Sequence, residues 1–438
     1  MQNQSAPLTE KKYVAPFILV TSLFFLWAIG VNLNDVLIPH LKKAFGLSDF
    51  QSSFIQVAFF GGYFLGALPA GRLMERIGYK RGILVGLLIC ATGALLFIPA
   101  ARMGAYAFFL FALFVMSSGQ SFLEVGANPY VTVLGPAESS ATRLNLAQSF
   151  NAVGAVMTPF LGALFILSGI EYSPAQLSAM STQQLAAYHA HEAGMVRGPY
   201  LAITGIFLLV AALIYFSRLP EVAVPGSDGT DRSADRNAKS IWAYPHLVKG
   251  VIAQFFYVGA QVGVGSFVIR FVKHTMPDTP EKMAAQFLVG HQVGFMIGRF
   301  AGSAIMKRVP APRLLAIFGI GALVCVAIGI GASGLVSVVA IVLVGFFNSI
   351  MFPTIFALSL KNLGSLTKRG SSLLVMSIIG GGLIPPVMGR ISDASNIQLA
   401  FLVPLVCYMY VIYFAVAGYK LKPVVSLQQA AAATEVKG

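Results

Sequence analysis

The stretch GILVGLLICATGALLFIPA, from Gly82 to Ala100, contains no charged side chain and is long enough to cross a lipid bilayer as a helix. A hydrocarbon core of roughly 30 Å needs about 20 apolar residues at a rise of 1.5 Å each. A second stretch of this kind, LLAIFGIGALVCVAIGIGA, runs from Leu314 to Ala332. Because such stretches recur along the chain, we expect an all-α polytopic membrane protein.

The composition agrees with this fold class. Of the 438 residues, 57% are apolar and 11% are charged, whereas soluble chains carry about 25% charge. A soluble enzyme and a disordered protein are therefore disfavoured. A net charge of +14 would suggest a nucleic-acid partner in a soluble protein. Here the basic residues gather in loops between apolar segments, so we expect the partner to be the bilayer and not nucleic acid.

Twelve transmembrane helices are expected. A polar stretch rich in Gly, Ser and Asp, GSDGTDRSADRNAKS, separates six of them from the other six and is typical of a flexible linker. We expect an amino-terminal bundle at 1–217, a cytoplasmic linker at 218–245, and a carboxy-terminal bundle at 246–438 that ends in a short cytoplasmic tail. The apolar segments lie at 15–38, 51–71, 81–101, 104–131, 144–169, 199–217, 246–272, 284–306, 313–332, 334–360, 370–390 and 398–419.

The loops give an orientation, and the two halves resemble each other. Loops on the side of both termini hold roughly three times as many Lys and Arg as the other loops, which places both termini in the cytoplasm. The sequence GYFLG at Gly62–Gly66 is echoed by GFMIG at Gly294–Gly298. A weak internal repeat across a central linker is typical of transporters with a site between their halves. We therefore expect two pseudo-symmetric six-helix bundles.

Polar side chains inside the apolar segments follow a pattern along the chain. They are present in most of the expected helices and almost absent from the third, sixth, ninth and twelfth. Since burying an amide or a carboxylate against lipid costs several kcal/mol, we expect those four helices outside and the others around a central polar cavity. The three cysteines, Cys90, Cys325 and Cys407, show no metal-ligand spacing, and we expect no metal site and no catalytic residue.

The segment GRLMERIGYKR, Gly71 to Arg81, resembles the signature loop of the major facilitator superfamily, with Glu75 where Asp is usual. Within that superfamily the chain resembles the fucose permease and bacterial glucose/galactose transporter family. The stretches that carry this resemblance span nearly the whole chain: SLFFLWAIGVNLNDVLIPH, LEVGANPYVTVLGP, RLNLAQSFNAVGA, AQFFYVGAQ, IGRFAG, PTIFALSLKNLG and IIGGGLIPPVMG. The resemblance implies a monomeric secondary transporter of a bacterial inner membrane that needs no cofactor.

Two carboxylates, Asp35 and Glu124, lie well inside apolar segments. Burial away from water favours the neutral form of a carboxyl group, so such a group can bind and release a proton as its exposure changes. Intramembrane acids are functional candidates by default, although each could instead make a structural hydrogen bond. The resemblance implies that both acids couple proton movement to sugar binding.

A sugar offers hydroxyl groups that donate and accept hydrogen bonds, as amides do, and a ring face on which an aromatic side chain can stack. We expect the sugar site to be built from Asn32, Gln120, Glu124, Gln148, Asn151, Gln254, Tyr257, Gln261 and Phe352. The family resemblance implies in particular that Gln148 and Asn151 lie in the sugar site with Glu124. Fucose permease has an aromatic hydroxyl where Phe352 stands here, which leaves the choice of monosaccharide open.

We expect a proton-coupled monosaccharide symporter, for L-fucose or a similar hexose, that works by alternating access. The signature loop implies that Arg72, Glu75, Arg76 and Arg81 act in gating. A glucose/galactose carrier coupled to sodium or protons is the alternative, and a membrane sugar receptor without transport is a remote one. His291 could be a second protonation site or a polar packing residue. The segment MSTQQLAAYHAHEAG, Met180 to Gly194, looks more like the fucose branch.

Overall fold

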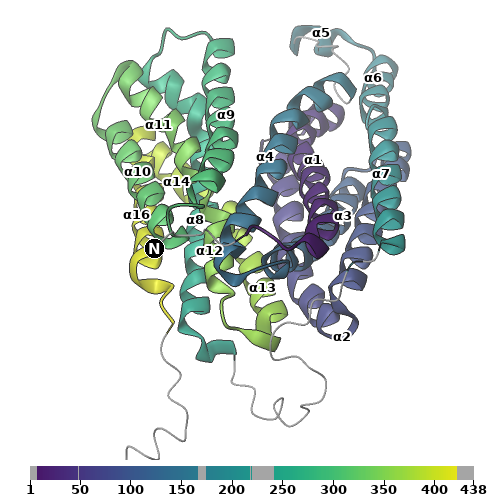
Figure 1. Cartoon of the computed structure of the whole chain (residues 1–438). Coiled ribbons are helices and arrows are strands. Elements are labelled where there is room, and N and C mark those ends of the chain that lie inside the picture. Colours follow the sequence, from purple (N-terminus) through teal and green to yellow (C-terminus); the bar gives the residue numbers. More distant parts are fainter. Residues whose placement is uncertain (1–6, 48, 166–173, 218, 220–240, 422–438) are drawn as a thin grey trace, which may run out of the picture.

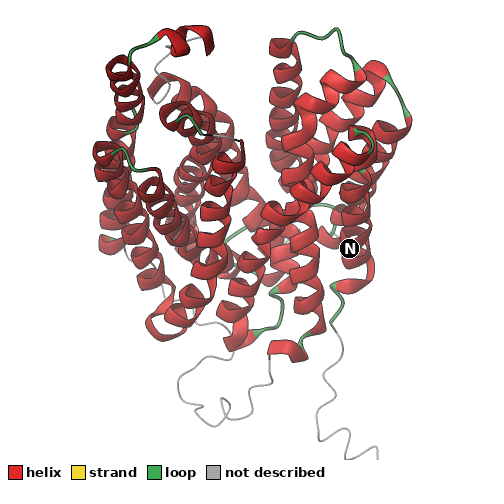
Figure 2. Cartoon of the chain, turned by 180° about the vertical axis from the view of Figure 1, so that it is seen from behind, coloured by secondary structure: helices red, strands yellow, loops and turns green. Residues whose placement is uncertain are grey.

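The computed structural model describes residues 7–47, 49–165, 174–217, 219 and 241–421, apart from a few side chains such as those of 34–39. Within these residues the regular secondary structure is helical, with turns and loops between the helices and no strand. Two groups of helices stand side by side (Figures 1 and 2). The first group contains α1 (Val14–Phe45), α2 (Asp49–Met103), α3 (Tyr106–Val133), α4 (Ser140–Phe165), α5 (Pro174–Ala179), α6 (Thr182–Gly194) and α7 (Arg197–Phe216).

The second group contains α8 (Pro245–Thr275), α9 (Glu281–Ile305), α10 (Ala311–Gly331), α11 (Gly334–Asn348), α12 (Met351–Ser359), α13 (Thr367–Met376), α14 (Gly380–Ala394), α15 (Ile397–Ala400) and α16 (Leu402–Tyr413). Most of the expected linker 218–245 and all of 422–438 lie outside the described residues. The domain boundaries at 217 and 246 therefore stay a prediction, as does the placement of the termini.

The element α2 is two membrane crossings joined end to end. It contains 55 residues, and a straight helix of that length would be about 80 Å long, more than twice the hydrocarbon core. It is divided at Gly78, whose backbone has φ 82° and ψ 171°. A side chain at this position would be strained, so the glycine in the GRLMERIGYKR segment sets the turn between two helices.

Twelve crossings result when the described helices are counted this way. Nine helical stretches, α2 among them, are long and apolar enough to span a membrane, and the break at Gly78 divides α2 into two. Helices α4 and α9 have 26 and 25 residues but are more polar, and they bring the count to twelve. The expected all-α membrane fold is confirmed.

The outer surface of the helices carries large apolar side chains. On α7, Leu209 is 60% exposed, and on α10, Ile317 is 54% exposed. The second arm of α2 exposes Leu88 and Leu95, and α16 exposes Val406 and Met409. These are the third, sixth, ninth and twelfth crossings. Exposed apolar side chains are stable against lipid, but helices such as α1 and α11 also carry them, at Ile18 and Leu335. That these four helices lie outermost therefore stays a prediction.

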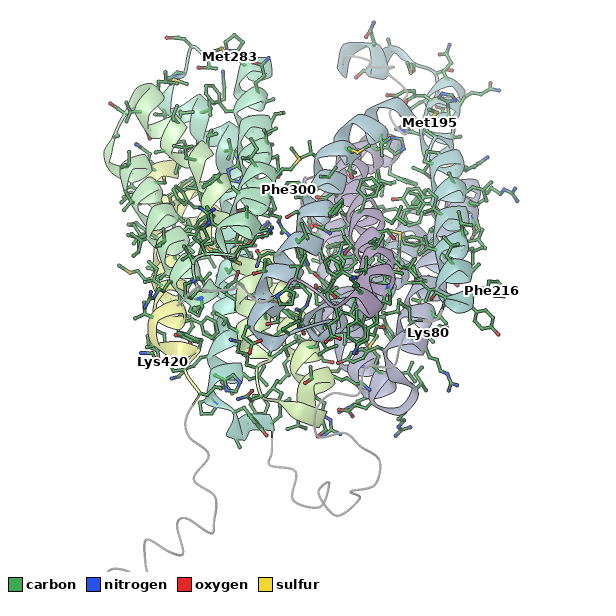
Figure 3. The ribbon with its side chains drawn as sticks, in the orientation of Figure 1. Lys80, Met195, Phe216, Met283, Phe300 and Lys420 are labelled. Carbon is green, nitrogen blue, oxygen red and sulfur yellow. The ribbon has the colours of Figure 1, made fainter. Side chains whose placement is uncertain are left out.

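The two groups of helices meet through α4 packed on α9, α2 packed on α13, and α12 packed on α4. They approach each other near the end that carries α13 and the turn of α2, and diverge toward the end that carries α5 (Figure 1). Lys80 and Lys420 lie toward the first end, whereas Met195 and Met283 lie toward the second (Figure 3). The two ends of the molecule therefore differ in how closely the bundles are joined.

Three polar contacts between the bundles lie toward the α13 end. Arg369 Nε is 2.6 Å from Glu75 Oε1. Ser371 Oγ donates to the Val125 carbonyl at 2.9 Å, and Asn145 Nδ2 donates to Thr354 Oγ1 at 3.1 Å. These contacts close that end of the interface.

Candidate functional site

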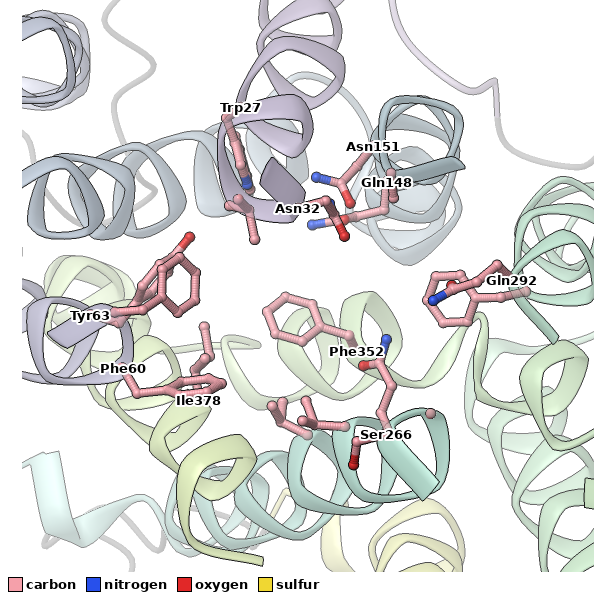
Figure 4. Close-up of a pocket in the computed structure, with 18 of the residues that line it drawn as sticks. Trp27, Asn32, Phe60, Tyr63, Gln148, Asn151, Ser266, Gln292, Phe352 and Ile378 are labelled. Atoms are coloured by element: carbon pink, nitrogen blue, oxygen red, sulfur yellow. The ribbon is translucent and has the colours of Figure 1, made fainter. Parts of the chain in front are cut away.

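A cavity of about 470 Å³ lies between the two bundles (Figure 4). Its volume is within the range of small-molecule sites. Helices α1, α2, α3 and α4 supply one wall, and α8, α9, α12 and the short 3₁₀ turn before α14 supply the other. The polar residues of α4 and α9 that line this cavity explain why these two helices are less apolar than their neighbours.

One wall presents amide oxygens to the cavity. Asn32, Gln148 and Asn151 lie together there (Figure 4). Asn32 Nδ2 donates to the Ala28 carbonyl at 2.7 Å, and Asn151 Nδ2 donates to the Phe24 carbonyl at 3.1 Å. Since each of these two amide nitrogens already donates to the backbone, the side-chain oxygens remain as acceptors for hydroxyl groups of a ligand.

Gln148 is held by partners from both bundles. Its Nε2 donates to Asn128 Oδ1 at 3.1 Å, and its Oε1 accepts from Arg299 Nη1 at 2.8 Å. The same guanidinium nitrogen donates to the Gln148 backbone carbonyl at 2.8 Å. The side chain of Gln148 is thus fixed in one orientation, 3% exposed, at the edge of the cavity.

Glu124 lies in the cavity wall with 7% of its surface exposed. Its Oε2 is buried and accepts no hydrogen bond. Within the described part of the chain, no basic nitrogen is recorded at ion-pair distance from this carboxyl group. A buried carboxylate without a partner is costly, and this arrangement therefore favours the protonated form of Glu124.

Phe352 and Gln261 lie in the opposite wall, as predicted. The Phe352 ring lies between those of Tyr257 and Phe356, with centroid distances of 6.5 and 6.0 Å. The ring is 8% exposed and forms part of the cavity wall. The sequence thus placed Asn32, Glu124, Gln148, Asn151, Gln261 and Phe352 together correctly as neighbours of one cavity, while their contact with a sugar stays a prediction.

Three predicted residues do not line the cavity. Gln120 and Gln254 are fully buried, and Tyr257 donates to the Asn348 carbonyl at 2.9 Å. Gln254 and Tyr257 share a helical face with Gln261 but precede it on α8 and are covered by neighbouring helices. The spacing identified the face of the helix correctly, but it carried no information about where along that face the cavity ends.

The side chain of Asp35 lies outside the described residues, so its role in proton coupling stays a prediction. In the signature segment, Arg72, Arg76 and Arg81 are exposed. Glu75 is the member of that segment with an ion pair to the other bundle. The structure thus places an acid, rather than the three arginines, at the contact between bundles.

Arg299 is the charged residue among those lining residues that the sequence did not assign to the site. Its position near the expected segment end suggested an ion pair or a side chain reaching toward the membrane surface, but it is 4% exposed and lines the cavity. Its guanidinium also lies over the Phe295 ring at 4.6 Å. An arginine inside the motif HQVGFMIGRFAG could have indicated a cavity-facing position, because charge inside the membrane is costly elsewhere.

Further polar and aromatic groups complete the lining. Among them, His291 was considered as a second protonation site, and the others were not assigned to the site. In the described residues no group of three or more His, Cys, Asp or Glu side chains could hold a metal ion. The additional lining residues include Trp27, Gln56, Phe59, Phe60, Tyr63, Ser266, His291, Gln292 and Phe295.

Two helical bundles around a closed-ended polar cavity define a polytopic membrane transporter, and comparison with known proteins agrees. Residues 20–378 match the model of the Major Facilitator Superfamily, and the chain belongs to this superfamily. Among relatives, an L-fucose-proton symporter of Escherichia coli (strain K12) is 43% identical over 93% of each chain. A glucose/galactose transporter of Brucella abortus (biovar 1, strain 9-941) is 42% identical over 94% of this chain and 96% of its own.

Solved structures show the same likeness. A crystal structure of the transporter FucP in the outward conformation has a TM-score of 0.85 at 43% identity, and the match covers 92% of this chain and 99% of that one. A proton:xylose symporter shares the fold alone, with a TM-score of 0.72 at 12% identity. The match covers 95% of this chain and 98% of that one. The predicted family is confirmed, and these relatives confirm a transporter rather than an enzyme.

Proposed function

We propose that this protein is a proton-coupled monosaccharide symporter of a bacterial inner membrane. It works as a monomer by alternating access, with both termini in the cytoplasm. The symporter and sugar-transporter relatives that match almost the whole chain support this proposal. No cofactor takes part, since the proton gradient supplies the driving force.

The observation that carries the proposal is the partnerless buried carboxyl group of Glu124 in the wall of an amide-lined cavity. Protonation neutralises this group and makes it a hydrogen-bond donor as well as an acceptor. The Asn32 and Asn151 oxygens accept from sugar hydroxyls, and the Phe352 ring stacks on the apolar face of the sugar. A neutral, filled cavity can then move between the two faces of the membrane more easily than a charged one.

The arrangement of contacts supports an outward-facing state. The ion pair and hydrogen bonds between bundles lie toward the end with Lys80 and Lys420 (Figure 3). Basic loops face the cytoplasm in membrane proteins. The closed end is accordingly cytoplasmic, and the cavity opens toward the outer side.

Transport by purified protein in proteoliposomes tests the proposal. We expect an inward proton gradient to drive accumulation of radiolabelled L-fucose, D-galactose or D-glucose without sodium, and a protonophore to abolish it. Accumulation that requires sodium and ignores the proton gradient would contradict proton coupling. Absence of flux for every monosaccharide in a panel, despite binding, would favour the non-transporting receptor.

A glucose/galactose carrier is the second candidate, and Phe352 favours it. An aromatic hydroxyl at this position is a feature of fucose permease according to the sequence resemblance, and this chain lacks it. Competition between monosaccharides for the purified protein ranks the candidates directly. Sodium in place of potassium in the same experiment tests the alternative coupling ion.

A further inference from the structure

A buried acid and a buried base line the same cavity from different bundles without being paired. Glu124 stands on α3 and Arg299 on α9. Glu124 Oε2 and Arg299 Nε are both buried and have no hydrogen-bond partner. Among the described residues Arg299 has no carboxylate at ion-pair distance, and its Nη1 donates instead to the neutral groups of Gln148.

We propose that Arg299 is the counter-ion of Glu124 in the part of the transport cycle in which Glu124 has lost its proton, and that Arg299 exchanges Gln148 for Glu124 at that step. This inference deepens the proposed function, on which it rests. Arg299 acts as a positioning residue. When Glu124 is protonated and sugar is bound, Arg299 holds Gln148 in place. When the carrier is empty and Glu124 has lost its proton, Arg299 neutralises the carboxylate.

The energetics of buried charge support this exchange. An isolated buried ion is expensive, whereas a pair of opposite ions that meet with hydrogen bonds is far less so. Net uptake requires the empty carrier to return without its proton, and that carrier would contain a bare carboxylate in the cavity wall. Pairing with Arg299 leaves the wall with no net charge. Protonation of Glu124 then frees the guanidinium to return to Gln148.

The other titratable groups near Glu124 are poor alternatives. Tyr63 on α2 also lines the cavity, but a phenol is uncharged near neutral pH, and Cys90 on the second arm of α2 is a buried thiol. His291 lies a little over two turns before Arg299 on α9, and its Nδ1 is unpartnered. Within the described residues, Arg299 is the permanently charged cation in the cavity lining.

The matched control is Arg270 on α8. Its guanidinium lies over the Phe267 ring at 4.0 Å, much as Arg299 lies over Phe295, but Arg270 is exposed and does not line the cavity. R299Q and R270Q therefore remove the same charge and the same kind of ring contact. R299K keeps a cation at the site but loses the planar fork of donors.

The test measures sugar binding to purified protein as a function of pH, together with exchange and proton-driven accumulation in proteoliposomes. Without the cation, Glu124 keeps its proton to higher pH. We expect R299Q to shift the midpoint of binding upward by about 1 to 3 pH units, the size of effect that a nearby opposite charge produces. R299Q should lose accumulation and retain exchange, while R299K and R270Q should keep the wild-type midpoint.

The contrary outcomes are distinct. R299Q could weaken sugar binding equally at every pH and leave the pH midpoint of binding unchanged. In that case Arg299 only orients the Gln148 side chain, and the proposal is overturned. The pair E124Q and E124Q/R299Q provides a second test, because without Glu124 the added substitution should leave any residual pH dependence unchanged. A shift between these two variants would also overturn the proposal. Wild-type binding that ignores pH would instead contradict the proposed function itself.

Discussion

Arg369 at the start of α13 reaches across the interface to Glu75 in α2, and its Nε lies 2.6 Å from Glu75 Oε1. The side chains of Arg369 and Glu75 are 57% and 23% exposed, respectively. A pair with this exposure contributes about 0.2–1 kcal/mol and is screened by salt. It can bias the balance between two conformations by a few-fold, but it cannot lock one of them.

E75Q should therefore shift the protein modestly toward opening at the α13 end. We expect a cysteine introduced by S372C, at a buried serine beside Gly71 in α2, to react with a maleimide about two- to five-fold faster in E75Q, the range given by up to 1 kcal/mol. High salt should produce the same change in the wild-type background.

R76Q is the control for that experiment, because Arg76 is exposed in the same segment. It should leave the rate of labelling unchanged. Equal rates in E75Q and in the unmodified background would show that the Glu75–Arg369 pair does not influence the conformational balance.

E124Q should separate exchange from accumulation. The amide resembles the protonated carboxyl group in shape, so sugar can still bind and be exchanged across the membrane, but no proton can be released. We expect exchange of labelled sugar in proteoliposomes to persist, while accumulation driven by a proton gradient falls to the level of passive equilibration. E138Q, at an exposed site between α3 and α4, is the matched control and should accumulate sugar normally. Accumulation by E124Q that still depends on pH would remove Glu124 from the coupling mechanism.

D35N should change the pH dependence of transport more than the affinity for sugar. This prediction comes from the position of Asp35 in an apolar segment and from the family resemblance, since its side chain lies outside the described residues. The measurement is the rate of uptake between acid and neutral pH, compared with the dissociation constant of the sugar. A wild-type pH profile in D35N would exclude Asp35 from proton coupling.

F352Y should alter the choice of sugar. The Phe352 ring is 8% exposed and lies in the cavity wall, so an added hydroxyl can reach a ligand. A site that hydrogen-bonds a ligand hydroxyl gains affinity for the sugar that offers it, at about 0.5–1.5 kcal/mol. We expect the ratio of affinities for L-fucose and D-galactose to change by about three- to ten-fold, measured by competition. F352L, which removes the ring, should weaken all sugars instead. An unchanged ratio in F352Y would show that position 352 does not determine specificity.

The fold could be predicted from the sequence because the membrane imposes one strong rule. Each crossing needs a long apolar helix, and segments such as Gly82–Ala100 meet it plainly. The same rule predicts which helices avoid lipid. It does not predict which residues of two neighbouring helices contact each other. For this reason Arg299 was not recognised as a partner of Gln148, although both residues lie in quoted motifs.

The sequence also could not show how far along a helical face the cavity extends. Gln254, Tyr257 and Gln261 share one face of α8, but only Gln261 reaches the cavity. The position of the cavity floor depends on how α12 packs against its neighbours, and that is a property of the assembled bundles. Similarly, the signature segment implied gating by Arg72, Glu75, Arg76 and Arg81 together, and among the described residues it is Glu75 that forms an ion pair with the other bundle.

R143Q should destabilise the protein rather than impair sugar recognition. Arg143 is fully buried near the start of α4, and its guanidinium donates to the Val131, Gly135 and Leu8 carbonyls at 3.1, 3.2 and 3.0 Å and to other oxygens nearby. It thereby satisfies the carbonyls at the end of α3 and holds the amino-terminal segment against the turn.

Glutamine cannot reach all these acceptors, and each buried acceptor left without a donor costs about 1–3 kcal/mol. We expect a lower midpoint of thermal unfolding in detergent for R143Q, and an intermediate value for R143K, because a single ammonium group replaces the planar fork. R81Q, at an exposed arginine, is the control and should unfold at the wild-type temperature. Sugar affinity at a temperature where R143Q is folded should be unchanged, since Arg143 does not line the cavity. A wild-type melting midpoint in R143Q would mean that water or neighbouring donors replace the guanidinium at no cost, and that this network does not stabilise the fold.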